Sequence, residues 1–317
     1  MAEVAFPEHA PVVRLIGETP LVDLSALSPN PAVTIQGKLE QRNPGGSIKD
    51  RPALYIARAA WPELARGATL VDATSGNTGI AYALLGRALG FPVHLFMPEN
   101  ASEERKRTFQ LYGARLTLTP AEEGQDGAIE ACQAYLAEDQ DAPIVYADQY
   151  SNEANPLAHE RTTGPEIDAQ SGAGLTHFVA GIGTGGTLTG TARYLAKHRP
   201  GVQIVGLQPA EPLHGMEGWK HLATNKVPAI LDPSVMDEER TVGTLAAWDT
   251  GARLLTEVGL ALGPSAGAAV AACCELASEL EEGHLVTILP DGFERYQSTR
   301  YAEHVLETVQ THPGADA

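Results

Sequence analysis

Two short glycine-rich loops, each placed between an apolar strand pattern and a helix pattern, constrain this chain most. They are Thr74-Ser75-Gly76-Asn77-Thr78-Gly79 and Gly183-Thr184-Gly185-Gly186-Thr187. In such a loop the backbone N–H groups face outward, and the next helix adds the positive end of its dipole. Together with Asn43 to Arg51, a segment that contains Lys49, the loops predict a carboxylate site, a phosphate site and a reactive amine in one cleft.

Strand and helix patterns alternate almost throughout, which is typical of α/β proteins with mostly parallel sheets. At 317 residues the chain exceeds the usual size of one hydrophobic core, so we predict two doubly wound domains. Asn, Ser and Pro interrupt the periodicity near residues 148–156, where we expect the boundary. The apolar strand patterns are residues 33–39, 69–73, 93–97, 115–118, 144–146, 178–182, 204–207 and 285–289. The helix patterns are residues 47–60, 78–89, 102–112, 127–136, 188–196, 246–258 and 266–280.

The composition excludes several classes of protein. A formal net charge of -18 opposes nucleic-acid binding, which depends on clusters of Lys and Arg. No apolar run approaches the ~18 residues of a membrane span, and the N-terminus lacks a signal-peptide pattern. Cys132, Cys273 and Cys274 fall in Ala-rich helix patterns without C-x-x-C spacing, and the histidines show no metal-ligand spacing. We therefore expect a cytoplasmic protein with packed free thiols and no metal, nucleic-acid or membrane partner.

Two predicted helix starts can be interpreted as simple helix caps, and the first of them also supports a functional interpretation. Ser47 would be a helix N-cap, with Asp50 completing a variant of the capping box. That interpretation leaves Lys49 unexplained, because a cation in the first helical turn opposes the helix dipole. The same position lowers the pKa of a lysine and favours a free amine that attacks an aldehyde. In the segment 263–267, Ser265 is most simply an N-cap.

Each glycine loop also has a simpler interpretation as an ordinary turn between a strand and a helix. In the first loop Ser75, Asn77 and Thr78 add hydroxyl and amide donors, which suit a carboxylate. The second loop is not a Walker loop, because no G-K-[ST] follows. It is not G-x-G-x-x-G either, because residues 187–189 lack the third glycine. ATP and NAD are therefore disfavoured.

The motifs occur in the order of a known family. They resemble the motif set of the cysteine synthases (O-acetylserine sulfhydrylases), which are fold type II pyridoxal-phosphate enzymes, at residues 43–51, 74–79, 183–187, 263–267 and 290–299. Residues 16–21 resemble the family's opening I-G-N-T-P-L, with Glu18 in place of Asn. Further resemblance to the B-type enzymes lies at residues 148–150, 162–166 and 206–209. The resemblance covers nearly the whole chain and implies a fold like that of the tryptophan synthase β subunit.

The resemblance also implies the roles of single residues. Lys49 looks like the Schiff-base lysine, which binds pyridoxal 5'-phosphate and takes the substrate's Cα proton. The other implied cofactor-binding residues are Asn77, Gly183, Thr184, Gly185, Gly186, Thr187 and Ser265. The implied substrate-binding residues are Thr74, Ser75, Gly76, Thr78 and Gln149. Residues 41–150 would form the N-terminal domain, with Lys49 and the carboxylate loop, and residues 1–40 plus 151–317 the C-terminal domain with the phosphate loop.

The implied reaction is a β-replacement that makes L-cysteine from O-acetyl-L-serine, or O-phosphoserine, and sulfide by way of an aminoacrylate. The alternative is a cystathionine β-synthase type of condensation between serine and homocysteine, which shares most of the motifs. A serine or threonine dehydratase is less consistent, because that group resembles S-F-K where this chain has Ser47-Ile48-Lys49. A non-catalytic scaffold is opposed by the intact Lys49, Asn77 and Ser265.

The resemblance further implies a homodimer that acts on small molecules and binds the tail of a serine acetyltransferase. B-type enzymes that use thiosulfate have a segment resembling P-G-I-R-R-W. In this chain Glu217 and Gly218 stand at the two arginine positions. We therefore expect sulfide to be preferred over thiosulfate, because a carboxylate repels a dianion.

Overall fold

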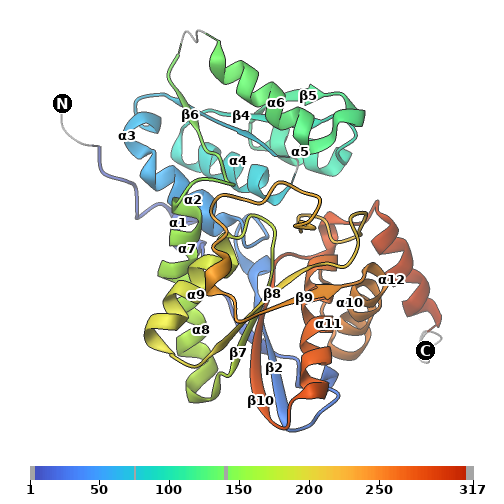
Figure 1. Cartoon of the computed structure of the whole chain (residues 1–317). Coiled ribbons are helices and arrows are strands. Elements are labelled where there is room, and N and C mark those ends of the chain that lie inside the picture. The colour runs from blue at the N-terminus through green and yellow to red at the C-terminus, as the bar shows by residue number, and fades with distance from the viewer. Residues whose placement is uncertain (1–3, 75, 139–141, 312–317) are drawn as a thin grey trace. The chain divides into compact units, whose positions relative to one another are not determined.

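The computed structural model of the chain describes residues 4–74, 76–138 and 142–311, which form two compact units. The first unit contains the residues up to Gly17 together with Asn43–Ala158, and the second contains Glu18–Arg42 and the described residues from His159 onward (Figure 1). The N-terminal segment belongs to the first unit because it joins that unit's core: Phe6 meets Trp61 with ring centroids 5.2 Å apart. The domain boundaries expected from the sequence, at residues 41 and 150, stay a prediction.

The first unit is built around a four-stranded parallel sheet with the strand order β5-β4-β3-β6. Alternate residues of β3 face opposite sides of this sheet. Leu70 packs into the core formed with α2, α4 and α5, and Val71 packs against α6. The elements are α1 (Pro11–Leu15), α2 (Asp50–Ala59), α3 (Trp61–Leu64), β3 (Thr69–Ala73), α4 (Asn77–Leu89), β4 (Val93–Pro98), α5 (Glu103–Leu111), β5 (Arg115–Thr119), α6 (Gly124–Ala137), β6 (Ile144–Tyr146) and α7 (Ala154–Ala158).

The strand order of this sheet reverses between β3 and β6. The chain runs from β3 to β4 and β5 on one side and returns to β6 on the other. In doubly wound sheets ligands bind at the carboxyl ends of the strands at such a reversal. The loop at residues 74–79 follows β3 and Gln149 follows β6, so the fold brings both predicted carboxylate-binding segments to this point.

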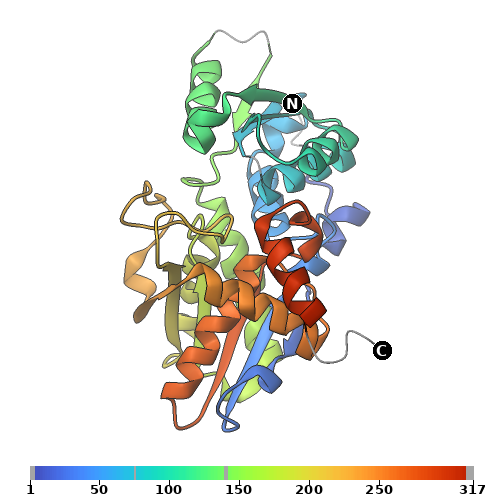
Figure 2. The ribbon, with the colours of Figure 1, turned by 90° about the vertical axis from the view of Figure 1, so that its right-hand side faces the viewer.

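The second unit is built around a six-stranded sheet with the order β1-β2-β10-β7-β8-β9. Only β1 is antiparallel to its neighbour. In Figure 1, α8 and α9 are labelled on one side of these strands and α10 and α11 on the other, and Figure 2 shows the red helix α12 beside orange α10. The elements are β1 (Leu21–Asp23), β2 (Val33–Leu39), a π-helical turn (His159–Thr163), α8 (Gly164–Ser171), β7 (His177–Gly181), α9 (Gly186–His198), β8 (Gln203–Pro209), β9 (Glu238–Val242), α10 (Thr244–Val258), α11 (Pro264–Glu279), β10 (Gly283–Leu289) and α12 (Arg300–Thr311). The strand order reverses between β7 and β10, and the loop at residues 183–187 follows β7.

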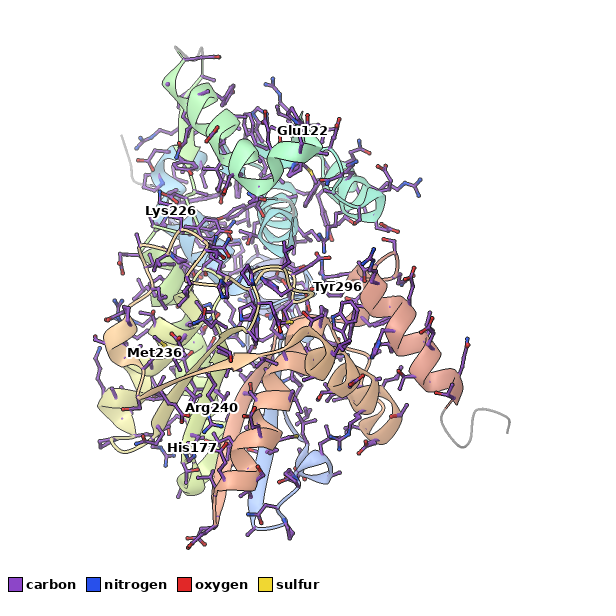
Figure 3. The ribbon with its side chains drawn as sticks, turned by 45° about the vertical axis from the view of Figure 1, so that its right-hand side comes forward. Glu122, His177, Lys226, Met236, Arg240 and Tyr296 are labelled. Atoms are coloured by element: carbon purple, nitrogen blue, oxygen red, sulfur yellow. The ribbon has the colours of Figure 1, made fainter. Side chains whose placement is uncertain are left out.

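This architecture confirms the predicted α/β class with mostly parallel sheets. Every predicted strand and helix pattern corresponds to an element. The strands β1 and β9 and the helices α1, α3, α7, α8 and α12 were not predicted. The strand β9 escapes the apolar pattern because Glu238, Glu239 and Arg240 occupy an edge strand, where charged side chains are tolerated. Arg240, labelled in Figure 3, pairs with Glu279 of α11 at 2.6 Å.

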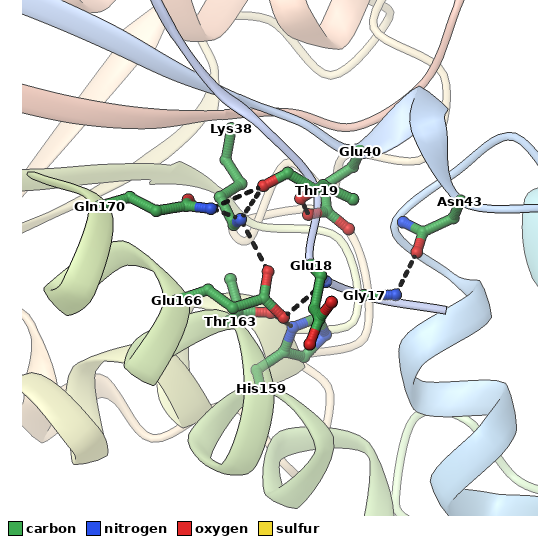
Figure 4. A network of polar contacts seen from close by, with 10 residues as sticks. All are labelled: Gly17, Glu18, Thr19, Lys38, Glu40, Asn43, His159, Thr163, Glu166 and Gln170. Carbon is green, nitrogen blue, oxygen red and sulfur yellow. Dashed lines mark hydrogen bonds and ion pairs between the residues drawn. The ribbon is translucent and has the colours of Figure 1, made fainter. Parts of the chain in front are cut away.

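A buried lysine joins the sheet of the second unit to α8 (Figure 4). Lys38 of β2 is fully buried, and its Nζ lies 2.7 Å from Oε2 of Glu166 and 2.9 Å from Oε1 of Gln170. The other carboxylate oxygen of Glu166 accepts the Glu18 N–H at 3.0 Å. A buried charge that lost these partners would be strongly unfavourable, so the network fixes the position of α8 on the sheet.

We expect Glu18→Asn to stabilise the protein by about 0.5–1 kcal/mol. Glu18 has a left-handed backbone with φ +48°, which Asn adopts more easily than Glu, and its side chain is exposed. Urea unfolding of the variant measures the change. Glu281→Asn, at an exposed position outside the left-handed region, is the control. Equal stabilities of the two variants would contradict a backbone effect at Glu18.

Candidate active site

Lys49 stands at the start of α2, where it is the N-cap residue and is half-buried. Its N–H donates to Oγ of Ser47 at 3.2 Å, and Asp50 accepts the N–H of Gly45. The capping box expected between Ser47 and Asp50 is therefore wrong, because Asp50 bonds further back along the chain. A Cβ on Gly45 would lie 2.3 Å from Oδ1 of Asp50, so a larger residue there would displace the Asp50 carboxylate. These contacts hold the lysine at the positive end of the α2 dipole.

The predicted carboxylate-binding residues meet at the strand reversal of the first unit. Thr78 Oγ1 donates to Oε1 of Gln149 at 2.7 Å, and both side chains are buried. The N–H of Gly76 donates to Oγ1 of Thr74 at 3.3 Å. Ser75 lies outside the described residues. Hydroxyl, amide and backbone N–H groups thus gather at the carboxyl ends of β3 and β6, as binding of a carboxylate requires.

Asn77 is the first residue of α4, which packs against α2. Two residues before Thr74, the carboxyl group of Asp72 is buried at the end of β3. Burial, with a smaller contribution from Asp148, raises the pKa of Asp72 to about 7. The sequence analysis missed this group, because an acidic residue inside an apolar strand carries no motif.

The predicted phosphate loop opens α9 in the second unit. Gly185 is the N-cap residue with φ +84°, and Oγ1 of Thr184 accepts the N–H of Gly186, the first residue of the helix, at 3.4 Å. A Cβ on Gly183 would lie 2.4 Å from the carbonyl oxygen of Gly218, so the loop packs too closely for any larger residue. A 13-residue helix contributes backbone N–H groups and a positive dipole at this end. The loop therefore fits a phosphate group.

A buried histidine orients the last side chain of this loop. His159 is 1% exposed, and its Nε2 lies 3.2 Å from Oγ1 of Thr187. Its Nδ1 lies 2.9 Å from Oγ1 of Thr163, on the same π-helical turn (Figure 4). The sequence does not reveal His159, because this residue belongs to no motif with a recognisable spacing.

Ser265 is not a helix N-cap, so that simpler interpretation is wrong. Gly263 occupies the N-cap position of α11, and no side chain caps the helix. The buried hydroxyl of Ser265 donates instead to the carbonyl of Glu217 at 3.3 Å. The next residue, Gly218, is the one that contacts Gly183. The segment 217–218 thus brings Ser265 and the phosphate loop together within the second unit.

A cavity of about 680 Å³ opens in the second unit next to Ser265. Its aromatic wall includes Tyr296, labelled in Figure 3. Burial lowers the pKa of His214 in this wall, which keeps the imidazole neutral at neutral pH. The charged and aromatic side chains that line it include Glu211, Glu217, Trp248, Tyr296 and Arg300.

The cysteines are packed thiols, as predicted. Cys132 and Cys273 are buried in α6 and α11, and burial raises the pKa of Cys132 to about 12. Within residues 4–74, 76–138 and 142–311, no three His, Cys, Asp or Glu side chains gather as metal ligands. Over the same ranges no helix is both long and apolar enough to cross a membrane.

Comparison with known proteins places the chain in a family. The model of the family "Pyridoxal-phosphate dependent enzyme" matches residues 12–291. The cysteine synthase of Aquifex aeolicus is 46% identical over 91% of this chain and 90% of its own length. The solved structure of an O-ureido-L-serine synthase has 37% identity and a TM-score of 0.86, over 96% of this chain and 97% of its own. O-acetylserine sulfhydrylase isoform 3 of Entamoeba histolytica has 31% identity and a TM-score of 0.86, over 98% and 100% of the two chains.

The chain belongs to the pyridoxal-phosphate-dependent enzymes of fold type II. The family resemblance, the fold type and the cofactor predicted from the motifs are confirmed. The closely packed loop at Gly183 and the helix end at α9 fit the phosphate of this cofactor. The roles of the individual site residues stay predictions.

Proposed function

We propose that the chain forms L-cysteine by β-replacement, in which sulfide takes the place of acetate in O-acetyl-L-serine or of phosphate in O-phosphoserine. The observation that carries this proposal is the environment of Ser265. Its hydroxyl is buried, is not used as a helix cap and is linked through residues 217–218 to the phosphate loop. A neutral partner makes the pyridine ring a weaker electron sink than a carboxylate would, which favours loss of a β-substituent over transamination.

We assign a role toward the cofactor to each of the following residues. When bound, pyridoxal phosphate supplies an aldehyde and an electron-withdrawing ring. Lys49 would hold the aldehyde and move the proton at the substrate Cα, and Asn77 would bind the ring 3-hydroxyl. Residues 183–187 would bind the phosphate, and Ser265 would serve as the partner of the pyridine nitrogen. The substrate carboxylate is assigned to Thr74, Ser75, Gly76, Thr78 and Gln149, of which Thr78 and Gln149 are hydrogen-bonded to each other.

The second substrate separates this function from the cystathionine β-synthase type of reaction. The experiment supplies the holoenzyme with O-acetyl-L-serine and either sulfide or L-homocysteine, and compares kcat/KM for the two nucleophiles. We expect sulfide to be used more efficiently. A higher kcat/KM for homocysteine would show that the chain catalyses the cystathionine β-synthase type of reaction and would contradict the proposed formation of cysteine.

We expect Glu217→Arg to raise kcat/KM for thiosulfate by about three- to tenfold at saturating O-acetyl-L-serine. Glu217 lines the cavity next to Ser265, and its carboxylate repels a dianion, whereas an arginine binds one. The unaltered protein should prefer sulfide. Glu282→Arg makes the same change of net charge at an exposed position and serves as the control. A preference of the unaltered protein for thiosulfate would overturn the role of Glu217.

Assembly and location are part of the same proposal. Small molecules are the substrates of this family, and we propose that the chain acts as a homodimer in the cytoplasm. We also propose that it binds the C-terminal tail of a serine acetyltransferase. Light scattering of the holoenzyme, with and without a peptide of such a tail, tests the dimer, and fluorescence anisotropy of the labelled peptide tests the binding.

A further inference from the structure

Asp72 is a buried carboxyl group close to the predicted carboxylate site of the first unit. It lies in β3 and is 2% exposed. Its Oδ1 accepts the N–H of Ala73 at 2.9 Å, and Gln125 of α6 donates to the carbonyl of Ala73 at 2.9 Å. In the described part of the chain, Oδ2 of Asp72 has no hydrogen-bond partner. One carboxyl oxygen therefore holds the end of β3, directly before Thr74, and the other is unsatisfied in the core.

The ladder between β3 and β6 ends beside this carboxyl group. The last backbone bond joins the N–H of Ala147 to the carbonyl of Val71 at 2.9 Å. The chain then turns at Asp148, which has a left-handed backbone with φ +42°. The backbone N–H of Gln149, on the far side of that turn, faces the Asp72 carboxyl and lowers its pKa. Asp72 thus lies where the two predicted carboxylate-binding segments separate.

Among the described residues, the group that acts on the pKa of Asp72 through its charge is Asp148, which raises it, whereas hydrogen-bonding groups lower it. The fully buried hydroxyl of Tyr82 faces the carboxyl group but makes no hydrogen bond of normal geometry with it. Burial raises the pKa of each neighbouring tyrosine and of the neighbouring cysteine, so these groups are uncharged at neutral pH. Asp148 adds a second negative charge. The groups come from four segments: Tyr82 of α4, Cys132 of α6, Tyr146 of β6, and Asp148 and Tyr150 after β6.

We propose that Asp72 is a positioning residue: its carboxyl group holds the end of β3 through the Ala73 N–H, beside the Asp148–Gln149 turn, and its charge sets the affinity of the site for the substrate carboxylate. The inference rests on the proposed function, because it takes Thr74 and Gln149 as carboxylate-binding groups. A neutral Asp72 leaves the local N–H donors to the substrate. An ionised Asp72 attracts the same donors and repels a second carboxylate.

The first test compares the unaltered holoenzyme with Asp72→Asn. Asn keeps the shape of the side chain and an oxygen that accepts the Ala73 N–H, but it cannot ionise. Because the pKa of Asp72 is about 7, we expect similar KM values for O-acetyl-L-serine on the acid side of that value. Between about pH 6 and about pH 8 the ratio of the two KM values, unaltered over variant, should rise about three- to tenfold. The ratio of the kcat values should stay within about twofold.

Taking the ratio of KM values removes the ionisation of the substrate amine, which affects both proteins equally. A ratio independent of pH, or a change confined to kcat, would overturn the proposal. Asp148→Asn is the matched variant, because Asn also tolerates the left-handed backbone. Without the repulsion by Asp148, the pH at which KM rises should move downward. An unchanged or upward midpoint would contradict the coupling of the two carboxyl groups.

Thermal unfolding gives a readout that needs no turnover. Folding raises the pKa of Asp72 from 3.8 to about 7, so the folded protein holds a proton that the unfolded chain releases between these values. Stability contributed by this proton is lost as the pH rises through that window. As the pH rises to about 7, the unaltered holoenzyme therefore loses this stability and Asp72→Asn does not. The difference in Tm, variant minus unaltered, should increase over that range and then level off. A Tm difference that does not depend on pH would contradict a buried, titrating Asp72.

The two readouts separate the inference from the proposed function. If no variant forms cysteine but the Tm difference follows the pH as expected, the reaction is wrong and the ionisation of Asp72 stands. If cysteine is formed and the KM ratio is flat, the positioning role fails while the reaction stands.

Discussion

Replacing Lys49 with Ala is expected to abolish cysteine formation, with kcat/KM at least about 10³-fold below that of the unaltered protein. Two contributions are lost together. The amine no longer holds the aldehyde of the cofactor, and no base takes the Cα proton of the substrate. The bond from the Lys49 N–H to Oγ of Ser47 and the bond from the Gly45 N–H to Asp50 use no Lys49 side-chain atom, so the turn is expected to keep these two contacts. The measurement is the steady-state rate of cysteine release with O-acetyl-L-serine and sulfide.

Two further variants make the result for Lys49 specific. Lys49→Arg keeps the positive charge but provides no primary amine, so it should be as inactive as the Ala variant. Lys226→Ala removes an exposed lysine of the second unit, labelled in Figure 3, and should keep full activity. Near-normal activity of Lys49→Ala, or recovery in Lys49→Arg, would assign the base to another residue.

Gly183→Ala is expected to weaken binding of pyridoxal phosphate by about 10- to 100-fold, which corresponds to about 1–3 kcal/mol. The added Cβ would lie 2.4 Å from the carbonyl oxygen of Gly218, a backbone atom that cannot rotate away. Either the phosphate loop or the segment 217–218 must move, and the latter also carries the partner of Ser265. Titration of the apoprotein with pyridoxal phosphate, followed by visible absorbance, gives the dissociation constant.

The matched control for this substitution is Gly174→Ala, which lies in the same unit. There the nearest atom to an added Cβ is Nδ1 of His284 at 3.6 Å, an ordinary contact. This variant should bind the cofactor as tightly as the unaltered protein. Equal cofactor affinities for Gly183→Ala and Gly174→Ala would show that the loop at residues 183–187 does not bind the phosphate.

The central strands could be predicted from the sequence because parallel strands covered on both faces are continuously apolar. The runs at residues 69–73, apart from Thr69 and Asp72, and 285–289, apart from Thr287, are of this kind and lie inside their sheets. Such a run has no equivalent in β1, which is three residues long, or in the charged edge strand β9. Helix α12 was not predicted either, although it buries Tyr301, Ala302 and Val305 and continues to Thr311.

Only those site residues that lie in recognisable sequence motifs could be predicted. Lys49 and the two glycine loops lie in segments with recognisable spacing, and the strand reversal explains why Thr78 and Gln149 meet although they are far apart in sequence. The helix caps were misjudged, because Asp50 bonds to Gly45 and Ser265 to Glu217 through contacts that spacing does not reveal. Oγ of Ser47, in turn, accepts the N–H of Lys49, two residues further on.

Residues that act through other residues left no pattern in the sequence. His159 reaches Thr187 across 28 residues, and Asp72 is recognisable only once burial and the turn at Asp148 are known. Both depend on tertiary packing, which determines which side chains lose contact with water.

The most direct test of the account identifies the product. The apoprotein is incubated with O-acetyl-L-serine and isotopically labelled sulfide, with and without added pyridoxal phosphate, and the products are analysed by mass spectrometry. The account predicts labelled L-cysteine and one acetate per turnover, formed only when the cofactor is present. Pyruvate and ammonia without labelled cysteine, or cysteine formation that does not depend on the cofactor, would contradict it.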